Sequence, residues 1–154
     1  MAGDATPTLF VICGLPGSGK TLLARRLETE HDALRLTPDE WMSRIVGDGW
    51  DHKRREAVEA VMTEIATRLL QLRRNVVLDF GCWTRTERDG LRALARSVGA
   101  RAETYYCTAP LAELQRRLSE RNQSLPPHTF VVTPEQVAEM FPHFEPQAPD
   151  ESDA

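Results

Sequence analysis

The stretch Gly14-Leu15-Pro16-Gly17-Ser18-Gly19-Lys20-Thr21 (GLPGSGKT) matches the pattern GxxxxGK[ST] at every fixed position. The apolar segment Thr8–Cys13 (TLFVIC) precedes it and is typical of a buried parallel strand. Residues 20–30, with leucines available to pack, predict a helix after it. Glycines let the loop point its N–H groups at an anion, and the helix N-terminus favours negative charge. The alternative, a turn that binds nothing, is disfavoured because strand, loop and helix occur in the required order.

We therefore expect this loop to bind ATP and Mg²⁺. Lys20 would contact the β- and γ-phosphates and act in catalysis, and the Thr21 hydroxyl would bind the metal. Asp79 ends a second apolar run, residues 75–80 (NVVLDF), and is the second expected metal-binding residue. Otherwise Asp79 is only a turn residue before Gly81. The residues expected to bind the nucleotide are Gly14, Pro16, Gly17, Ser18, Gly19, Lys20, Thr21 and Leu22.

Predicted strands and helices alternate along the chain. Strands are expected at 8–13, 33–36, 75–80, 102–107 and 130–132, and helices at 20–30, 37–46, 52–74, 84–98, 110–122 and from 133. Capping boxes are expected where Thr37, Thr84 and Thr133 each precede Glu or Gln by three residues. This pattern predicts a three-layer α/β fold, in which a central parallel sheet of about five strands is flanked by helices.

Length and composition favour one domain. The chain has 154 residues and a net charge of −4, which does not suggest bulk binding of nucleic acid. No apolar run is long enough to span a membrane and no signal-peptide pattern opens the chain, so we expect a cytoplasmic protein. Residues 1–141 are expected to form the domain, and residues 142–154 an acidic, Pro-rich tail that is extended or partly disordered. Three widely spaced cysteines indicate neither a metal site nor disulfides.

Asp39 is the candidate acid that orients or deprotonates an acceptor hydroxyl. It follows the predicted strand 33–36, whose carboxyl end should lie near the phosphate loop. The competing interpretation is that Asp39 only stabilises the first turn of a helix. Trp41 and Trp83 follow the two acids closely and are interpreted as packing residues, with lining of the acceptor pocket as the alternative.

Arginines are the candidates for binding phosphate or an anionic acceptor. Arg117 and Arg121 are i, i+4 neighbours and could close over the γ-phosphate, where they would be catalytic and Arg117 would also bind the nucleotide. Any single arginine is more often a solvated surface residue than a ligand. The candidates for substrate binding are Arg44, Arg54, Arg55, Arg85 and Arg88, with Arg44, Arg85 and Arg88 favoured.

Five segments together resemble small P-loop kinases of the AAA-family ATP-binding group. They are GLPGSGKT (14–21), RLTPDEW (35–41), VVLDFGCWTRTERD (76–89), LQRRLSERN (114–122) and FEPQAPDE (144–151). The likeness includes chloramphenicol phosphotransferases, zeta-toxin-type kinases and polynucleotide 5′-hydroxyl kinases. It implies an acceptor-activating Asp39, a basic lid carrying Arg117 and Arg121, and an adenine pocket near Thr133. Polynucleotide kinases usually carry an arginine where this chain has Met42, and the chain is too short for a remodelling AAA+ motor.

The leading hypothesis is a kinase that moves the ATP γ-phosphate to a hydroxyl of a small molecule or nucleotide. One alternative is a polynucleotide 5′-hydroxyl kinase, which would show strong salt dependence. The other is an ATP-binding switch that hydrolyses slowly and has no acceptor. The sequence names neither the acceptor nor the oligomeric state, because acceptor pockets are built from variable loops.

Overall fold

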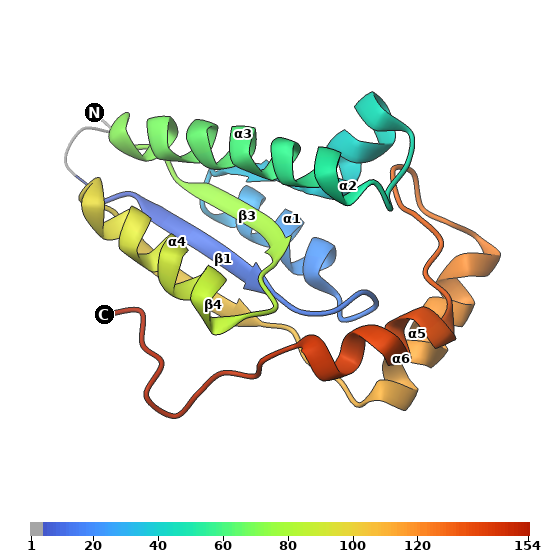
Figure 1. Ribbon diagram of the computed structural model, residues 1–154. Helices are drawn as coiled ribbons and strands as arrows, with labels where there is room; N and C mark the ends of the chain where they lie inside the picture. The colour runs from blue at the N-terminus through green and yellow to red at the C-terminus, as the bar shows by residue number, and fades with distance from the viewer. Residues whose placement is uncertain (1–4) are drawn as a thin grey trace.

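A four-stranded, entirely parallel sheet forms the centre of the computed structural model, which describes residues 5–154 (Figure 1). The strands are β1 (Thr8–Cys13), β2 (Leu34–Leu36), β3 (Val76–Gly81) and β4 (Arg101–Tyr106), and their order is β2-β3-β1-β4. The strand that precedes the phosphate loop therefore lies beside the strand that carries Asp79. Pairing of Leu9 with Val76 and of Val11 with Leu78 fixes this register.

Helices cover both faces of the sheet, as the alternation of elements predicts. Figure 1 shows α3 and α4 over one face and α1 behind the other, while α5 and α6 lie at the end of the sheet where β1 runs into the phosphate loop. The helices are α1 (Lys20–Glu30), α2 (Pro38–Trp41), the π-helix η1 (Met42–Val46), α3 (His52–Gln71), α4 (Arg85–Ser97), α5 (Leu111–Gln123), α6 (Pro134–Met140) and the 3₁₀-helix η2 (Phe141–His143). The three-layer α/β prediction is confirmed.

Apolar side chains of the sheet divide into two buried layers. Leu9, Val11 and Leu78 pack under α3 and α4, and Phe10 and Ile12 pack under α1. Because neighbouring residues of one strand alternate between these two layers, β1 is buried on both sides. A third cluster joins Leu15 of the phosphate loop to α5 and α6, and it contains Leu114, Leu118, Val132 and Val137. The phosphate loop is thus held by apolar contacts between Leu15 and the helices α5 and α6.

The expected fifth strand, residues 130–132, is not a strand. Side chains of α5 bind this segment's carbonyls instead: Asn122 Nδ2 donates to Val132 O at 2.9 Å and an Arg121 guanidinium nitrogen donates to Phe130 O at 3.3 Å. The Val132 side chain is buried against Leu15 and α5. The segment therefore has helix partners that replace a neighbouring strand, which an apolar, β-branched sequence cannot reveal.

Two of the three predicted capping boxes are confirmed. Thr84 with Glu87 opens α4, and Thr133 with Gln136 opens α6. The prediction at Thr37 is wrong, because its side chain makes no cap hydrogen bond. The Thr37 hydroxyl instead accepts from Arg35 at 2.6 Å and donates to an Asp79 carboxylate oxygen at 3.1 Å. A buried partner outcompetes the local cap at this position.

The C-terminal segment is extended and crosses from α6 past α4 to the edge of the sheet (Figure 1). Its Glu151 carboxylate is fully buried and accepts from two guanidiniums, Arg88 at 2.5 and 3.0 Å and Arg92 at 2.9 Å. Asp153 accepts the Thr104 backbone N–H at 2.9 Å, so the tail also occupies part of the free edge of β4. Ion pairs with α4 and hydrogen bonds with β4 therefore hold this acidic segment in place.

The tail explains two arginines that the sequence analysis placed at a substrate. Arg88 is fully buried, and it donates to Glu151 and to the Cys82 carbonyl. Arg85 pairs with Asp150 at 2.8 Å and with Asp89 at 3.2 Å on the outer surface. Neither side chain lines the cleft described below, so the structure does not bring Arg85 and Arg88, the predicted substrate ligands, to that cleft. The tail's carboxylates neutralise both charges instead.

Glu151→Gln tests this anchor. The substitution leaves Arg88 and Arg92 buried without their shared counterion, and we expect it to lower the free energy of unfolding by about 3–5 kcal/mol. Urea denaturation at pH 7 measures this loss. Asp150→Asn, which changes an exposed carboxylate one residue away, is the matched control and should behave as wild type. Equal stability of the Glu151→Gln variant and wild type would contradict the anchor.

The same network predicts an acid dependence. Hydrogen bonds from Arg88 hold the pKa of Glu151 well below its usual range. Its contribution is therefore fully present above about pH 4.3, the ordinary pKa of Glu, and is lost as the pH falls towards the lowered folded-state value. Wild type should lose more stability than Glu151→Gln over that acidic range.

Candidate active site

The phosphate loop connects β1 to α1 with glycines in left-handed conformations. Gly17 has φ +83°, and a Cβ there would lie 3.1 Å from Leu118 Cγ, so α5 packs directly on the loop. Gly14 N donates to Gly81 O at 2.9 Å, which joins the start of the loop to the end of β3. The first-turn N–H groups of α1 have no helical acceptors and are oriented to bind an anion.

Asp79 is at the centre of the hydrogen bonds below this loop. Its Oδ2 atom accepts from the Thr21 hydroxyl at 2.8 Å and from the Thr37 hydroxyl at 3.1 Å. Its Oδ1 atom is buried and has no hydrogen-bond partner among the described residues. A buried carboxylate oxygen without a donor is costly and is a ready ligand for a cation.

These residues fit a magnesium ion that uses few protein ligands. Mg²⁺ in phosphate-transfer sites is commonly held by one or two side-chain oxygens, with phosphates and water completing its shell. The Thr21 hydroxyl and the Asp79 carboxylate are such a pair. Residues 5–154 contain no group of three or more His, Cys, Asp or Glu side chains arranged to hold a metal without a phosphate.

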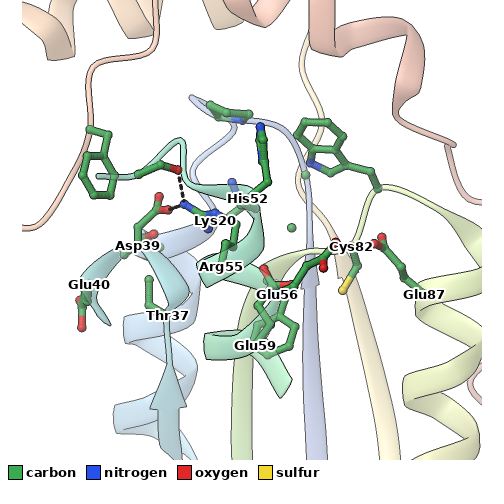
Figure 2. A pocket seen from close by; sticks show the side chains of 18 of the residues that line it. Lys20, Thr37, Asp39, Glu40, His52, Arg55, Glu56, Glu59, Cys82 and Glu87 are labelled. Atoms are coloured by element: carbon green, nitrogen blue, oxygen red, sulfur yellow. Dashed lines mark hydrogen bonds and ion pairs between the residues drawn. The ribbon is translucent and has the colours of Figure 1, made fainter. Parts of the chain in front are cut away.

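A cleft of about 940 Å³ opens beside the loop and is lined by Lys20, Thr21 and Asp39. Lys20 Nζ donates to Leu15 O at 3.3 Å, which keeps the side chain close to its own loop. Figure 2 shows Lys20, Asp39 and Arg55 facing the same space, with α3 forming one wall. The cleft therefore brings the lysine of the phosphate loop and the Asp39 carboxylate to the same space.

Asp39 pairs with Arg55 rather than with any group of its own helix. An Arg55 guanidinium nitrogen lies 2.5 Å from Asp39 Oδ1 and also donates to Gly49 O at 3.2 Å. Half of the Asp39 side-chain surface is exposed, so the carboxylate remains accessible from the cleft. Of the arginines after Asp39, Arg54 is exposed and pairs with Asp51, and Arg44 is exposed and does not line the cleft.

The two arginines of α5 occupy different surroundings. Arg117 is exposed, pairs with Glu113 at 2.9 Å and donates to Gly17 O at 3.3 Å, on the outer side of the phosphate loop. Arg121 lines the cleft, and its Nε is buried without a partner among the described residues. Burial lowers the pKa of Arg121. The pair therefore does not converge on one point in this structure.

The remaining predicted nucleotide residues lie around the same loop. Leu22 is largely exposed on α1, and Ser18 Oγ is buried without a partner among the described residues. The Thr133 hydroxyl caps α6 by accepting the Gln136 N–H at 3.1 Å. Trp83 lines the cleft, whereas Trp41 packs against the core layer under α3 and α4. One of the two tryptophans thus lines the cleft.

Glu59 is a residue of this cleft that sequence reasoning missed. Burial raises its pKa to about 7; the Arg55 charge lowers it, and the Glu87, Asp39 and Glu56 charges add to the increase. Glu56 and Glu59 are i, i+3 neighbours on α3 and therefore share one face of this helix. This spacing is the sequence feature that could have identified Glu59 as part of an acidic surface. Glu87 was interpreted only as half of a capping box, although it also lines the cleft.

A family model described as an AAA domain matches residues 9–147. The chain belongs to the AAA domain family. No curated protein matches significantly. None of the helices within residues 5–154 has the length and apolarity needed to cross a bilayer.

Solved structures confirm a kinase-like P-loop fold. A chain of the Pnkp1/Rnl/Hen1 RNA repair complex is 18% identical with a TM-score of 0.75, and the match covers 94% of this chain and 46% of that one. A gluconokinase from Sinorhizobium meliloti 1021 is 18% identical, with a TM-score of 0.63 and coverages of 96% and 80%. The Mycobacterium tuberculosis APS kinase CysC, solved with AMPPNP and APS, is 19% identical, with a TM-score of 0.61 and coverages of 91% and 98%. The chain spans less than half the length of the Pnkp1/Rnl/Hen1 chains that it matches.

Glu59→Gln should reveal the unfavourable charge in the cleft. A carboxylate whose pKa rises on folding destabilises the protein as the pH increases from the unfolded pKa, about 4.3, through the folded value near 7. We expect the variant to exceed wild type in stability at pH 8 by about 2 kcal/mol and to lose this pH dependence. Each tenfold change in an acid constant corresponds to about 1.4 kcal/mol, and the resulting ~3.7 kcal/mol is reduced because water partly screens this incompletely buried side chain.

Thermal or urea unfolding between pH 4 and pH 9 measures the difference. Glu64→Gln is the matched control, since Glu64 is an exposed residue of the same helix that does not line the cleft. If both variants showed the wild-type dependence of stability on pH, the negative charge of Glu59 would not be unfavourable in the folded protein.

Proposed function

We propose that this protein is an ATP-dependent phosphotransferase that moves the γ-phosphate to a hydroxyl of a small molecule or nucleotide. One observation carries the proposal: a phosphate loop, a buried acid with a free oxygen atom and a second, accessible acid meet at one cleft. A binding module needs the first two. The accessible Asp39, which lines the same cleft as Lys20, is the feature that favours an acceptor over a binding module.

The nucleotide half of the site is assigned to the loop and to β3. The N–H groups of the loop and the start of α1 would bind the phosphates, and Lys20 would neutralise charge on the transferring group. Thr21 and Asp79 would hold Mg²⁺, which neutralises phosphate charge when bound. Arg121 in the cleft and Arg117 on the loop's outer side are the candidates for contacting the γ-phosphate as α5 moves relative to the loop.

Asp39 is assigned to the acceptor hydroxyl. The Arg55 guanidinium fixes one carboxylate oxygen, and the second oxygen is left to accept the hydroxyl proton or to orient the hydroxyl for in-line attack. Because phosphoryl transfer depends mainly on positioning and charge neutralisation, holding the acceptor and the phosphate loop at fixed positions is the chief contribution of the chain.

Substitution of each acid and of the lysine separates binding from transfer. Lys20→Ala should reduce transfer at least 100-fold and weaken ATP binding, because its charge lies at the phosphates. Asp39→Asn should reduce kcat about 100-fold or more and leave the ATP dissociation constant within about threefold of wild type. The assay follows γ-labelled ATP with nucleosides, sugars, antibiotics and 5′-hydroxyl oligonucleotides as acceptors.

Asp32→Asn is the control, since Asp32 is exposed in the turn before β2, at the opposite end of the sheet. A full transfer rate in Asp39→Asn would refute the acceptor role. ATP binding with slow hydrolysis and no transfer to any acceptor would support the switch alternative, and transfer only to oligonucleotides would support the polynucleotide kinase alternative.

Asp79→Asn tests the metal assignment. The amide keeps the shape of the side chain but removes the negative charge, so we expect the Mg²⁺ concentration for half-maximal ATP binding to rise about tenfold or more. Binding measured with EDTA in place of Mg²⁺ should change little. Circular dichroism and thermal unfolding control for a fold that depends on the Thr21 and Thr37 hydrogen bonds. Unchanged Mg²⁺ dependence in a folded variant would remove Asp79 from the metal site.

A further inference from the structure

The floor of the cleft differs in charge from its phosphate end. Lys20 and Arg25 lie near the phosphate loop, whereas Glu56 and Glu59 from α3 and Glu87 from α4 line the space between these two helices. Figure 2 shows the α3 carboxylates and Glu87 on opposite sides of this space, with Cys82 between them. The cleft therefore continues from the phosphate loop into an acidic section, in which Glu59 is partly buried and Glu56 and Glu87 are exposed.

The carboxylates of the floor lack basic partners. No ion pair involves Glu56, Glu59 or Glu87 among residues 5–154, and Arg55, whose charge acts on Glu59, is engaged by Asp39 and Gly49 O. Glu87 uses one oxygen to accept the Thr84 N–H at 3.2 Å, which leaves the other oxygen for a ligand. Arg88 and Arg92 of α4 do not neutralise these carboxylates, because both guanidiniums pair with acids of the C-terminal tail.

Apolar side chains complete the acidic section of the cleft. Phe80, Leu91 and Leu94 line it together with the aliphatic edge of α3 at Ala60 and Thr63. Such a surface packs against a carbon skeleton, while carboxylates facing each other across it favour a positive charge. A phosphate or carboxylate in this place would be repelled by several unpaired acids, and its desolvation would not be compensated.

The roof of the cleft limits the size of the acceptor. Gly49 packs against the ring of Phe130, and a Cβ on Gly49 would lie 2.4 Å from the nearest ring atom. The loop before α3 and the loop before α6 therefore touch above the cavity, and both line it. The contact narrows the cleft on this side, which favours a compact acceptor over a long polymer.

We propose that the phosphate acceptor is a small hydroxylated amine, such as an amino alcohol or amino sugar, whose ammonium group binds Glu59 and Glu87. One of its hydroxyls then lies beside Asp39, at the phosphate end of the same cavity. This inference rests on the proposed function, since it assigns the acceptor of that transfer. It places the positive charge of the ligand where the chain leaves negative charge unpaired.

Matched pairs of ligands isolate the charge. Choline against 3,3-dimethylbutan-1-ol, and glucosamine against glucose, differ in charge but little in shape. Isothermal titration with the full chain, with and without Mg²⁺ and a non-hydrolysable ATP analogue, should show that at least one amine binds tenfold or more tightly than its neutral partner. Glu59→Gln should remove most of that preference, and Glu64→Gln should keep it.

The pH dependence gives a readout that a structural role for Glu59 would not produce. The groups that act on this carboxylate are Arg55, Glu87, Asp39 and Glu56, and burial raises its pKa to about 7. Cys82 and His52 also line the cleft, so His52→Gln serves as the control for titration of the imidazole. Glu59 must ionise to bind a fixed cation, so choline affinity should rise up to about tenfold between pH 6 and pH 8. The affinity for the neutral partner should stay flat.

The outcomes separate this inference from the proposed function. Transfer of label from ATP to any acceptor tests the kinase, and the amine preference tests the floor of the cleft. The inference is overturned if no amine is preferred, if the preference survives Glu59→Gln, or if oligonucleotides or other anionic acceptors are used equally well by wild type and Glu59→Gln. Should Glu59→Gln not fold, Glu87→Gln replaces it, because Gln retains the capping box of α4.

Discussion

The shared carboxylate oxygen of Asp79 is the interaction on which the site depends. It receives hydroxyl hydrogen bonds from Thr21, in the first turn of α1, and from Thr37, at the junction of β2 and α2. These two elements flank β3 in space but are separated along the chain. Because Asp39 lies only two residues after Thr37, one buried carboxylate links the position of Asp39 to that of the phosphate loop. In the proposed function, metal binding and acceptor positioning would therefore be coupled through a single side chain.

Local patterns predicted the elements because local contacts form them. The strands of the sheet and the helices that cover it lie within a few residues of their expected bounds, and the phosphate loop has its expected context. The exceptions are positions where a side-chain partner replaces the expected cap or strand hydrogen bond. Thr37 could cap its helix, but a buried acid 42 residues away binds its hydroxyl. Residues 130–132 could pair as a strand, but side chains of α5 bind their carbonyls.

Charged side chains were the least predictable part of the site. Arginine is equally suited to a phosphate, a carboxylate or solvent, and the sequence does not say which one it meets. Arg88 and Arg92 bind a glutamate about sixty residues later, in a segment whose composition suggested little order. Arg55 binds Asp39 through a helix that folds back over the sheet. Glu59 differs from these arginines, because the fold places other acids near it and none of the described residues forms an ion pair with it.

These placements give the cleft a gradient of charge that has a chemical consequence. The phosphate end is positive and polar, the far end is acidic and apolar, and Asp39 lies between them with its charge partly balanced by Arg55. A ligand with phosphate character is drawn to the first end only, so a second anionic group has no favourable place beyond Asp39. An acceptor that is polar at one side and cationic at the other meets complementary charge at both. Selectivity then follows from where the chain leaves charges unpaired, and the contact between Gly49 and Phe130 adds the requirement that the acceptor be compact.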